Sequence, residues 1–334
     1  MADYAKFLEA GRRAVEDASL VCRQVQRALD QVKAITKDDK SPVTVADYAS
    51  QAIVAHRLRE ALGPVVLVGE EGSAFLRDED NQTYRDATLA AVREVWPEAD
   101  ERTLLDAIDA GAGDPSHASF WTLDPIDGTK GFLRGQQYAV ALAYIERGRP
   151  VIGVLGCPNL PSSFTDPLDR ADSHGCLYFT ISGQGLWEVH ADKQGAPPKH
   201  IHRALREPGD PIRACESVET AHSKQDDTAK ILARVGSAGE PVRLDSQCKY
   251  AVVARGQADA YLRMPTKKDY VERIWDHAAG ALVAHEGGCV VTDIHGRDLD
   301  FAHGRGLETN RGIVCAPPDV HGPILGAIKD LGLA

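Results

Sequence analysis

The sequence predicts a mixed α/β protein built as two domains. Its 334 residues are enough for a large core, and 43% hydrophobic with 26% charged residues is typical of globular proteins. Strand-like runs separated by short turn signals fill the first half, which favours an antiparallel sheet. Strand and helix signals alternate in the second half, after a segment rich in proline, lysine and glycine at 192–211. We therefore expect an N-terminal α+β domain over residues 1–195 and a C-terminal α/β domain over residues 196–334.

Each element is predicted from its periodicity and its end signals. Apolar residues at helical spacing run from Phe7 to Val32, and a second helix runs from Asp47 to Leu62, where Gly63 and Pro64 end it. Strands of the antiparallel sheet are expected at 65–69, 120–123, 138–145, 151–156, 176–181 and 185–190. Helices outside this sheet are expected at 83–96 and 101–110. The second half is expected to hold strands or helices at 212–215, 224–235, 247–255, 258–262, 274–286, 289–292, 312–315 and 319–331.

Bulk properties exclude several classes of function. A net charge of -11 argues against a partner that is a nucleic-acid polymer, which would require a basic surface. The seven cysteines lack any C-x-x-C spacing, so buried free thiols in a reducing compartment are expected, and the twelve histidines show no zinc spacing. No basic-then-apolar leader and no apolar run of about 18 residues occur, so the sequence predicts a soluble, cytoplasmic protein. It carries no signal of strong self-association, and a monomer or weak dimer is expected.

The segment from Asp124 to Phe132 is the most specific chemical signal. Asp124 and Asp127 stand three residues apart around a proline, and the apolar run before them indicates a strand that stops at Asp124. The chain then turns through Gly128 and Thr129, which suits a helix start. Two carboxylates and a row of free backbone N–H groups would meet there. Divalent cations bind the first, and a phosphate group binds the second.

Other acidic motifs point to the same chemistry. Glu70 follows a β-branched run, Asp276 stands among apolar residues near a predicted helix start, and Asp47 precedes a helix-like stretch. Each alone also fits an ordinary strand end, helix cap or turn. Together with Asp124 and Asp127 they supply the carboxylates of a site for several Mg²⁺ ions, which clamp attacking and leaving oxygens.

These motifs resemble the lithium-sensitive, magnesium-dependent phosphatases that include the inositol monophosphatases and fructose-1,6-bisphosphatases. A narrower resemblance, to the 3′(2′),5′-bisphosphate nucleotidases of sulfur metabolism, is carried by segments 41–48, 153–160, 216–223, 244–250 and 261–265. It covers about residues 37–317. It implies a five-layer α-β-α-β-α sandwich with the site at the domain junction, and sensitivity to Li⁺.

The resemblance also implies metal ligands and catalytic groups. Glu70, Asp124 and the carbonyl of Ile126 would bind one Mg²⁺, and Asp124, Asp127 and Asp276 a second. A third, weaker ion near Glu70 would supply the attacking water, giving two to three ions in all. A hydrogen-bonded pair of Thr129 and Asp47 would orient that water and accept its proton, while the N–H groups of Gly128 and Thr129 hold the phosphate. Side chains expected to orient these ligands are Glu71, Lys130 and His277.

The substrate implied by the resemblance is 3′-phosphoadenosine 5′-phosphate, with its sulfated form as a second candidate. His222, Ser246, Lys249 and Arg263 match positions that contact the nucleotide, and the two cations would bind the 5′-phosphate. For Lys249 and Arg263 the alternative is a solvated face of a helix and an edge strand, and for His222 a capping role. Alternative functions are an inositol phosphate phosphatase, and a non-catalytic nucleotide-binding regulator, which would be expected to have lost a carboxylate or Thr129.

Overall fold

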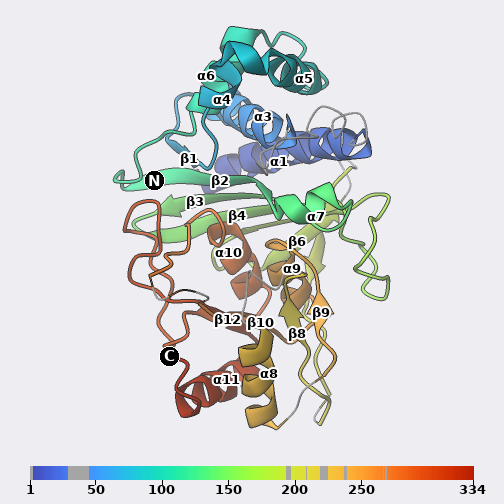
Figure 1. The fold of residues 1–334 in the computed structure, drawn as a ribbon, viewed down its shortest axis with the longest axis vertical. Helices are drawn as coiled ribbons and strands as arrows, with labels where there is room; N and C mark the ends of the chain where they lie inside the picture. The colour runs from blue at the N-terminus through green and yellow to red at the C-terminus, as the bar shows by residue number, and fades with distance from the viewer. Residues whose placement is uncertain are drawn as a thin grey trace.

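The computed structural model describes residues 3–28, 45–192, 197–207, 209–218, 225–236, 239–265, 267 and 269–334. Figure 1 shows five layers in the order helices, sheet, helices, sheet, helices, which confirms the expected sandwich. A seven-stranded sheet and a five-stranded sheet form the second and fourth layers. His222 lies outside the described residues, as do the predicted helix beyond Ala28 and the start of the motif at 41–48.

Two long helices cover the outer face of the first sheet. Helix α1 (Tyr4–Arg27) begins at Asp3, whose side chain accepts a hydrogen bond from the Lys6 N–H, and buries a stripe of small apolar residues. Helix α3 (Val45–Leu62) packs beside it and ends at Gly63, whose positive φ of 78° suits glycine. The two helices share a hydrophobic core with the first sheet, to which alternate residues of the strands, among them Trp121, contribute their side chains.

The first sheet is antiparallel except at one edge. Strands β2 (Ser119–Asp127), β3 (Ala139–Glu146), β4 (Arg149–Cys157), β5 (Cys176–Ile181), β6 (Leu186–His190) and β7 (Lys199–Ile201) pair in sequence order. Strand β1 (Leu67–Gly69) runs parallel to β2, because the chain between them crosses over through α4 (Ala74–Arg77), α5 (Gln82–Val92) and α6 (Glu101–Asp109). The sheet extends to Ile201, and the division at residue 195 stays a prediction.

The second sheet has the order β11-β12-β10-β8-β9. Its strands are β8 (Ala214–Glu216), β9 (Val242–Arg243), β10 (Ala260–Arg263), β11 (Val290–Thr292) and β12 (Ile313–Ala316). Helices α8 (Gln225–Val235) and α11 (Pro318–Asp330) cover its outer face, while α9 (Cys248–Ala254) and α10 (Ala278–Glu286) lie between the sheets. Every described side chain of α10 from Ala278 to Ala284 is buried, as a helix between two sheets requires.

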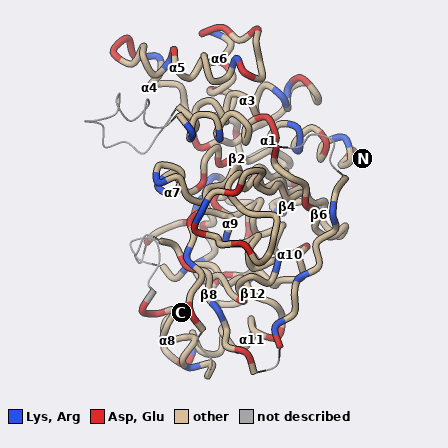
Figure 2. The backbone as a smooth tube through the Cα atoms, turned by 90° about the vertical axis from the view of Figure 1, so that its right-hand side faces the viewer, with Lys and Arg blue, Asp and Glu red and all other residues tan. Residues whose placement is uncertain are grey.

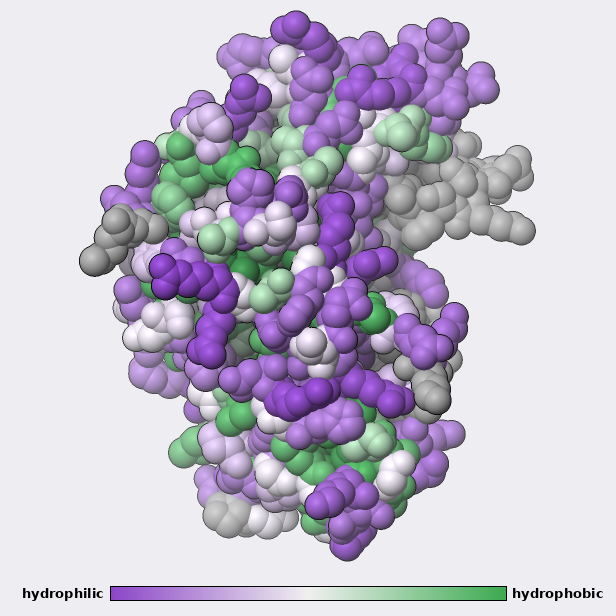
Figure 3. Space-filling view, turned by 90° about the vertical axis from the view of Figure 1, so that its left-hand side faces the viewer, coloured by the Kyte–Doolittle hydropathy of each residue, from purple (hydrophilic) through white to green (hydrophobic). Residues whose placement is uncertain are grey.

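Figure 2 shows basic and acidic positions interspersed along the chain, and Figure 3 shows a side on which hydrophilic residues surround smaller hydrophobic patches. All seven cysteines are free and buried, as expected. Among the described residues, no helix is long and apolar enough to span a bilayer. Compartment and oligomeric state stay predictions.

Candidate active site

The end of β2 carries two acidic side chains on one face of the sheet. Asp124 pairs with Ala141 of β3 and Asp127 with Ala139, so the register shifts between them. Because Ala139 and Ala141 are two residues apart, their side chains share a face, and the shift puts both aspartates on that face. The prediction that the strand stops at Asp124 is wrong. The strand continues because the bulge accommodates Pro125, which has no N–H to donate to a ladder.

Glu70 lies beside Asp124 because β1 and β2 are parallel. The last residue of β1 pairs with Leu123, so the next residues along the two strands come together. Gln51 of α3 fixes the chain at this point: its side chain accepts from the Glu71 N–H at 3.1 Å and donates to the Glu71 carbonyl at 2.6 Å. The sequence did not single out Gln51, since a side chain that binds distant backbone leaves no local motif.

Asp276 reaches the same place from the turn before α10. The predicted helix start at residue 274 is wrong: α10 begins at Ala278, because His277 has the non-helical angles φ -136° and ψ -30°. The N–H groups of His277 and Ala278 instead bond back to the carbonyl of Ile274, at 3.3 and 2.9 Å. Asp276 therefore projects from a turn and not from the helix.

Gln247 joins the acidic strand end to this turn. Its backbone N–H donates to Asp127 Oδ2 at 2.5 Å. Its side chain donates to the carbonyl of Trp275 at 2.8 Å and accepts from the N–H of Gly280 at 2.9 Å. One buried residue thus fixes two predicted ligands from opposite halves of the chain. Gln247 lies within the segment 244–250, but its sequence context does not indicate this role because its partners are distant in the sequence.

These groups line one cavity of about 530 Å³ between the two halves of the molecule. Figure 1 shows α7 (Thr129–Leu133), which follows β2, on the side of the first sheet that faces α9. The lining residues are Glu70, Asp124, Ile126, Asp127, Gly128, Thr129, Lys130, Ser217, Asp245, Ser246, Lys249, Arg263, Met264, Lys267, Tyr270, Glu272 and Asp276. Of the described residues predicted to be catalytic, metal-binding or substrate-binding, Asp47 alone is outside the lining, and it is buried in the first turn of α3. Glu71 and His277, expected from the sequence to orient the ligands, also lie outside the lining.

Burial raises the pKa values of the carboxylates, and repulsion between neighbouring carboxylates adds to it for Glu70, Asp124 and Asp276. For Asp124, which is 3% exposed, burial and repulsion from Glu70, Asp127, Asp276 and Asp47 raise the pKa well above its usual range. The Glu70 side chain reaches solvent at the cavity mouth. Even so, the surrounding protein and the charges of Glu71 and Asp127 raise its pKa to about 7.

The pKa values of Asp276 and Asp127 are also raised. The pKa of Asp276 rises to about 7, mainly from burial, although His277 and Arg263 oppose the rise. Burial also raises the pKa of Asp127, against the charge of Lys249 and the N–H of Gln247. Burial, with added repulsion between carboxylates at Glu70, Asp124 and Asp276, therefore favours the protonated forms of these groups in the metal-free protein.

The donor set fits hard divalent cations. All of the predicted ligands are oxygens, which Mg²⁺ prefers over the nitrogen and sulfur ligands of zinc. Asp124 Oδ1 is buried, and no hydrogen-bond partner for it is found in the described part of the chain. A buried carboxylate oxygen without a donor is costly, and a cation would satisfy it.

Two cationic side chains, Lys249 and Arg263, line the same cavity as the acidic ones. Lys249 on α9 is 4% exposed, and its ammonium lies 5.1 Å from the centre of the Tyr261 ring. Burial lowers the pKa of Lys249, while Asp127 opposes the change. The alternative of a solvated helix face is therefore wrong for Lys249. Arg263 ends β10 and donates from Nε to Glu272 Oε1 at 2.8 Å.

Glu272 extends this contact into a buried network that sequence analysis missed. Its second oxygen lies 3.3 Å from His277 Nε2, and His277 Nδ1 lies 2.9 Å from the Tyr250 hydroxyl. Burial raises the pKa of Glu272, but hydrogen bonds from His277 and Arg263 outweigh it and leave the pKa below its usual value. The charged Glu272 therefore fixes the direction of the Arg263 guanidinium. Nothing in the sequence around Glu272 predicts a pairing with residues on other elements.

The turn after Asp127 packs closely on the second half of the chain. Gly128 caps α7 with φ 86°, and a Cβ there would lie 2.8 Å from the Cβ of Ser246. Ser246 itself has φ 72°, an uncommon conformation for a residue with a side chain. The Thr129 hydroxyl donates to the carbonyl of Ile126 at 3.2 Å. Thr129 and the backbone of this turn therefore face the same cavity as the carboxylates.

Comparisons with known proteins agree with this geometry. The model describing the inositol monophosphatase family matches residues 3–331. A Schizosaccharomyces pombe protein named 3′(2′),5′-bisphosphate nucleotidase is 39% identical over 320 residues, covering 92% of this chain and 90% of its own. A rice (Oryza sativa subsp. japonica) protein of the same name is 41% identical, covering 98% and 94%.

Solved structures show the same fold. An inositol monophosphatase from Anabaena matches with a TM-score of 0.62 at 17% identity, over 98% of this chain and 97% of the other. CysQ from Bacteroides thetaiotaomicron, a bacterial member of the inositol monophosphatase family, matches with a TM-score of 0.62 at 21% identity, over 92% and 96%.

Proposed function

Because this chain belongs to the inositol monophosphatase family, we propose that it is a Mg²⁺-dependent phosphatase acting on a 3′(2′),5′-bisphosphate nucleotide. The favoured substrate is 3′-phosphoadenosine 5′-phosphate, with AMP and phosphate as products and the sulfated nucleotide as a second substrate. One observation carries the proposal: the four proposed metal-binding carboxylates line the same cavity as Lys249 and Arg263. A substrate with two separated phosphates requires both groups.

The proposed roles follow from position. Glu70, Asp124 and the Ile126 carbonyl would hold one Mg²⁺, and Asp124, Asp127 and Asp276 would hold another; all of these residues line the cavity. Bound Mg²⁺ offsets phosphate charge and lowers the pKa of water. The water oxygen bonds to phosphorus while the bond to the 3′ oxygen breaks, and that oxygen leaves with a proton. Thr129 and Asp47 orient the water and accept its proton.

The remaining residues bind the substrate. Backbone N–H groups of Gly128 and Thr129 hold the reacting phosphate. Lys249 and Arg263 bind the 5′-phosphate, where two charge-assisted contacts compensate a dianion that lies away from the metal ligands. Ser246 contacts the nucleotide between these two ends, together with His222, which lies outside the described residues.

A direct test compares three substrates. Phosphate release is measured with Mg²⁺ from 3′-phosphoadenosine 5′-phosphate, inositol monophosphate and fructose 1,6-bisphosphate, and again after chelation. We expect the highest kcat/KM for the nucleotide and loss of all activity on chelation. Asp124→Asn, purified in the same way, controls for contaminating phosphatases. Preference for inositol monophosphate would support the inositol alternative, and no turnover of any substrate would support the non-catalytic one.

A further inference from the structure

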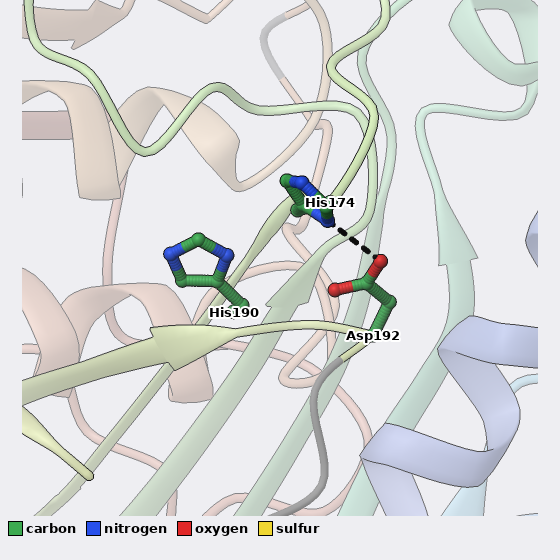
Figure 4. Close-up of side chains that lie close together, drawn as sticks. All are labelled: His174, His190 and Asp192. Atoms are coloured by element: carbon green, nitrogen blue, oxygen red, sulfur yellow. Dashed lines mark hydrogen bonds and ion pairs between the residues drawn. The ribbon is translucent and has the colours of Figure 1, made fainter. Parts of the chain in front are cut away.

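Three metal-binding side chains meet at the open end of the β5–β6 hairpin, away from the active-site cavity. In the hairpin register Cys176 pairs with His190, and the Ala191 N–H continues the pairing by donating to the carbonyl of Gly175 at 3.1 Å. Continued by two residues, this register sets His174 opposite Asp192. The side chains of His174, His190 and Asp192 come together at this end of the hairpin. Figure 4 shows the three side chains grouped there.

The distances suit a shared ligand. One ligand atom from each of His174, His190 and Asp192 lies within 4.8 Å of the others. His174 Nδ1 contacts Asp192 Oδ2 at 2.8 Å, and the rings of the two histidines are 5.3 Å apart. His190 Nδ1 is buried, and the described part of the chain offers it no hydrogen-bond partner. This ring nitrogen lies beside a second histidine and a carboxylate. Because it makes no hydrogen bond to the described residues, it can bind a metal ion.

The backbone that carries His174 is fixed. Asp172 Oδ1 accepts hydrogen bonds from the N–H groups of His174 and Gly175, both at 2.8 Å. Gly175 has φ 68°, and a Cβ there would lie 2.2 Å from the carbonyl of Pro158. His174 is therefore held opposite Asp192 by the packing of the loop and not only by its own side-chain contact.

We propose that His174, His190 and Asp192 form a site for a transition-metal ion of the zinc type, separate from the Mg²⁺ site. Two imidazoles and one carboxylate are ligands that Zn²⁺ accepts, with water in the fourth position. Tetrahedral bonds of about 2.0–2.1 Å separate neighbouring ligand atoms by about 3.3 Å. To reach this spacing, the distance from His174 Nδ1 to Asp192 Oδ2 must increase by about 0.5 Å, which the exposed position of Asp192 permits. The His190 ring must move toward these two atoms. The spacing of the histidines along the sequence does not predict this cluster, because the hairpin register brings together residues that the sequence separates.

Another pair in the chain shows what an ordinary histidine–aspartate contact looks like. His303 Nε2 contacts Asp300 Oδ2 at 2.9 Å, in the same kind of contact as His174 and Asp192. Among the described residues, no third metal-binding group joins this pair. His303→Ala is therefore a matched control that removes a histidine–aspartate contact without removing the proposed site.

The test measures binding of Zn²⁺ alone to the tag-free protein. The chain is first treated with chelator and then saturated with Mg²⁺, so that the acidic cavity is occupied, and Zn²⁺ is titrated by calorimetry. We expect one saturable site, and a loss of affinity of at least about tenfold in His190→Ala and in Asp192→Asn. His303→Ala should bind as the unmodified protein does. Co²⁺ bound in place of Zn²⁺ should give the intense visible absorption of tetrahedral coordination.

Two results would overturn the proposal. One is unchanged Zn²⁺ affinity in a His174→Ala, His190→Ala double variant. The other is loss of Zn²⁺ binding in Asp276→Asn, which would place the ion in the acidic cavity. Because the three side chains are at least partly exposed, the variants should keep the metal-free melting temperature and the Mg²⁺-dependent turnover. Asp192→Asn keeps the side-chain shape and so tests coordination separately from packing.

Discussion

Asp124 is the residue on which the acidic cluster converges. Every other predicted metal-binding carboxylate raises its pKa, and its buried Oδ1 finds no donor in the described part of the chain. A group in this position opposes folding of the metal-free protein. A bound cation would compensate this charge.

We expect Asp124→Asn to separate activity from stability. Loss of one ligand charge should lower kcat on the order of three decades, the scale of other electrostatic contributions to catalysis. The metal-free variant should melt no lower than the unmodified protein, because an amide removes repulsion. Turnover and thermal melting in chelator check both points. A variant that keeps a tenth of normal kcat would contradict the bridging role of Asp124.

Arg263 and Lys249 are expected to determine substrate preference. Arg263→Ala or Lys249→Ala should lower kcat/KM for the bisphosphate about ten- to a hundredfold, since each removes one charge-assisted contact worth about 1.5–3 kcal/mol. Hydrolysis of adenosine 3′-monophosphate should scarcely change. Arg234→Ala, which removes an exposed arginine paired with Asp330, is the matched control. Equal losses on both substrates would instead assign these cations to the reacting phosphate or to the fold.

At the scale of elements, the sequence predicted the acidic motifs because they are contiguous. The segment from Asp124 to Thr129 carries its ligands, its turn and its helix start within a few residues, and the structure places all of them at one cavity. The sequence did not predict the bulge, because whether the strand ends or continues at Pro125 depends on its pairing with β3. Gln247 and Glu272 were missed because their partners lie on other elements.

The close packing between α7 and the Ser246 loop gives a prediction for Gly128→Ala. Both the positive φ and the approach to Ser246 oppose a methyl group, so stability should fall by at least about 1–2 kcal/mol and turnover should fall as the N–H groups shift. Gly63→Ala has a similar φ but open space around it, so it should lose stability and keep turnover. Denaturant unfolding and kcat measure the two effects. Equal turnover in both variants would show that the turn does not position the phosphate.

At the scale of the whole molecule, the cavity exists because two sheets are held at a fixed distance. Helix α10 fills the space between them with small side chains, and Gly280 allows the Tyr250 ring to approach closely. Gln247 then connects the strand end of the first sheet to the turn that carries Asp276. The sequence predicted which residues each half contributes. It did not predict their separation, which depends on packing across the middle layer.

The raised pKa values of the cavity carboxylates predict how the free energy of unfolding depends on pH and on Mg²⁺. In the metal-free protein the pKa values of Glu70 and Asp276 are about 7, against about 4 in an unfolded chain. The folded state therefore binds more protons between these values. The stability that this provides is complete below pH of about 4 and is lost as the pH rises through about 7.

Mg²⁺ binds the deprotonated carboxylates and should reverse this loss. The rise in melting temperature produced by saturating Mg²⁺ should be larger at pH 8 than at pH 6, by a few degrees at Mg²⁺ concentrations far above its Kd. Comparing the Mg²⁺-dependent rise at each pH removes the contribution of other titrating groups. In Asp124→Asn the rise should be small at both values. A rise in the unmodified protein that is equal at pH 6 and pH 8 would show that these carboxylates are already ionised without metal, and that the cavity is less repulsive than its geometry indicates.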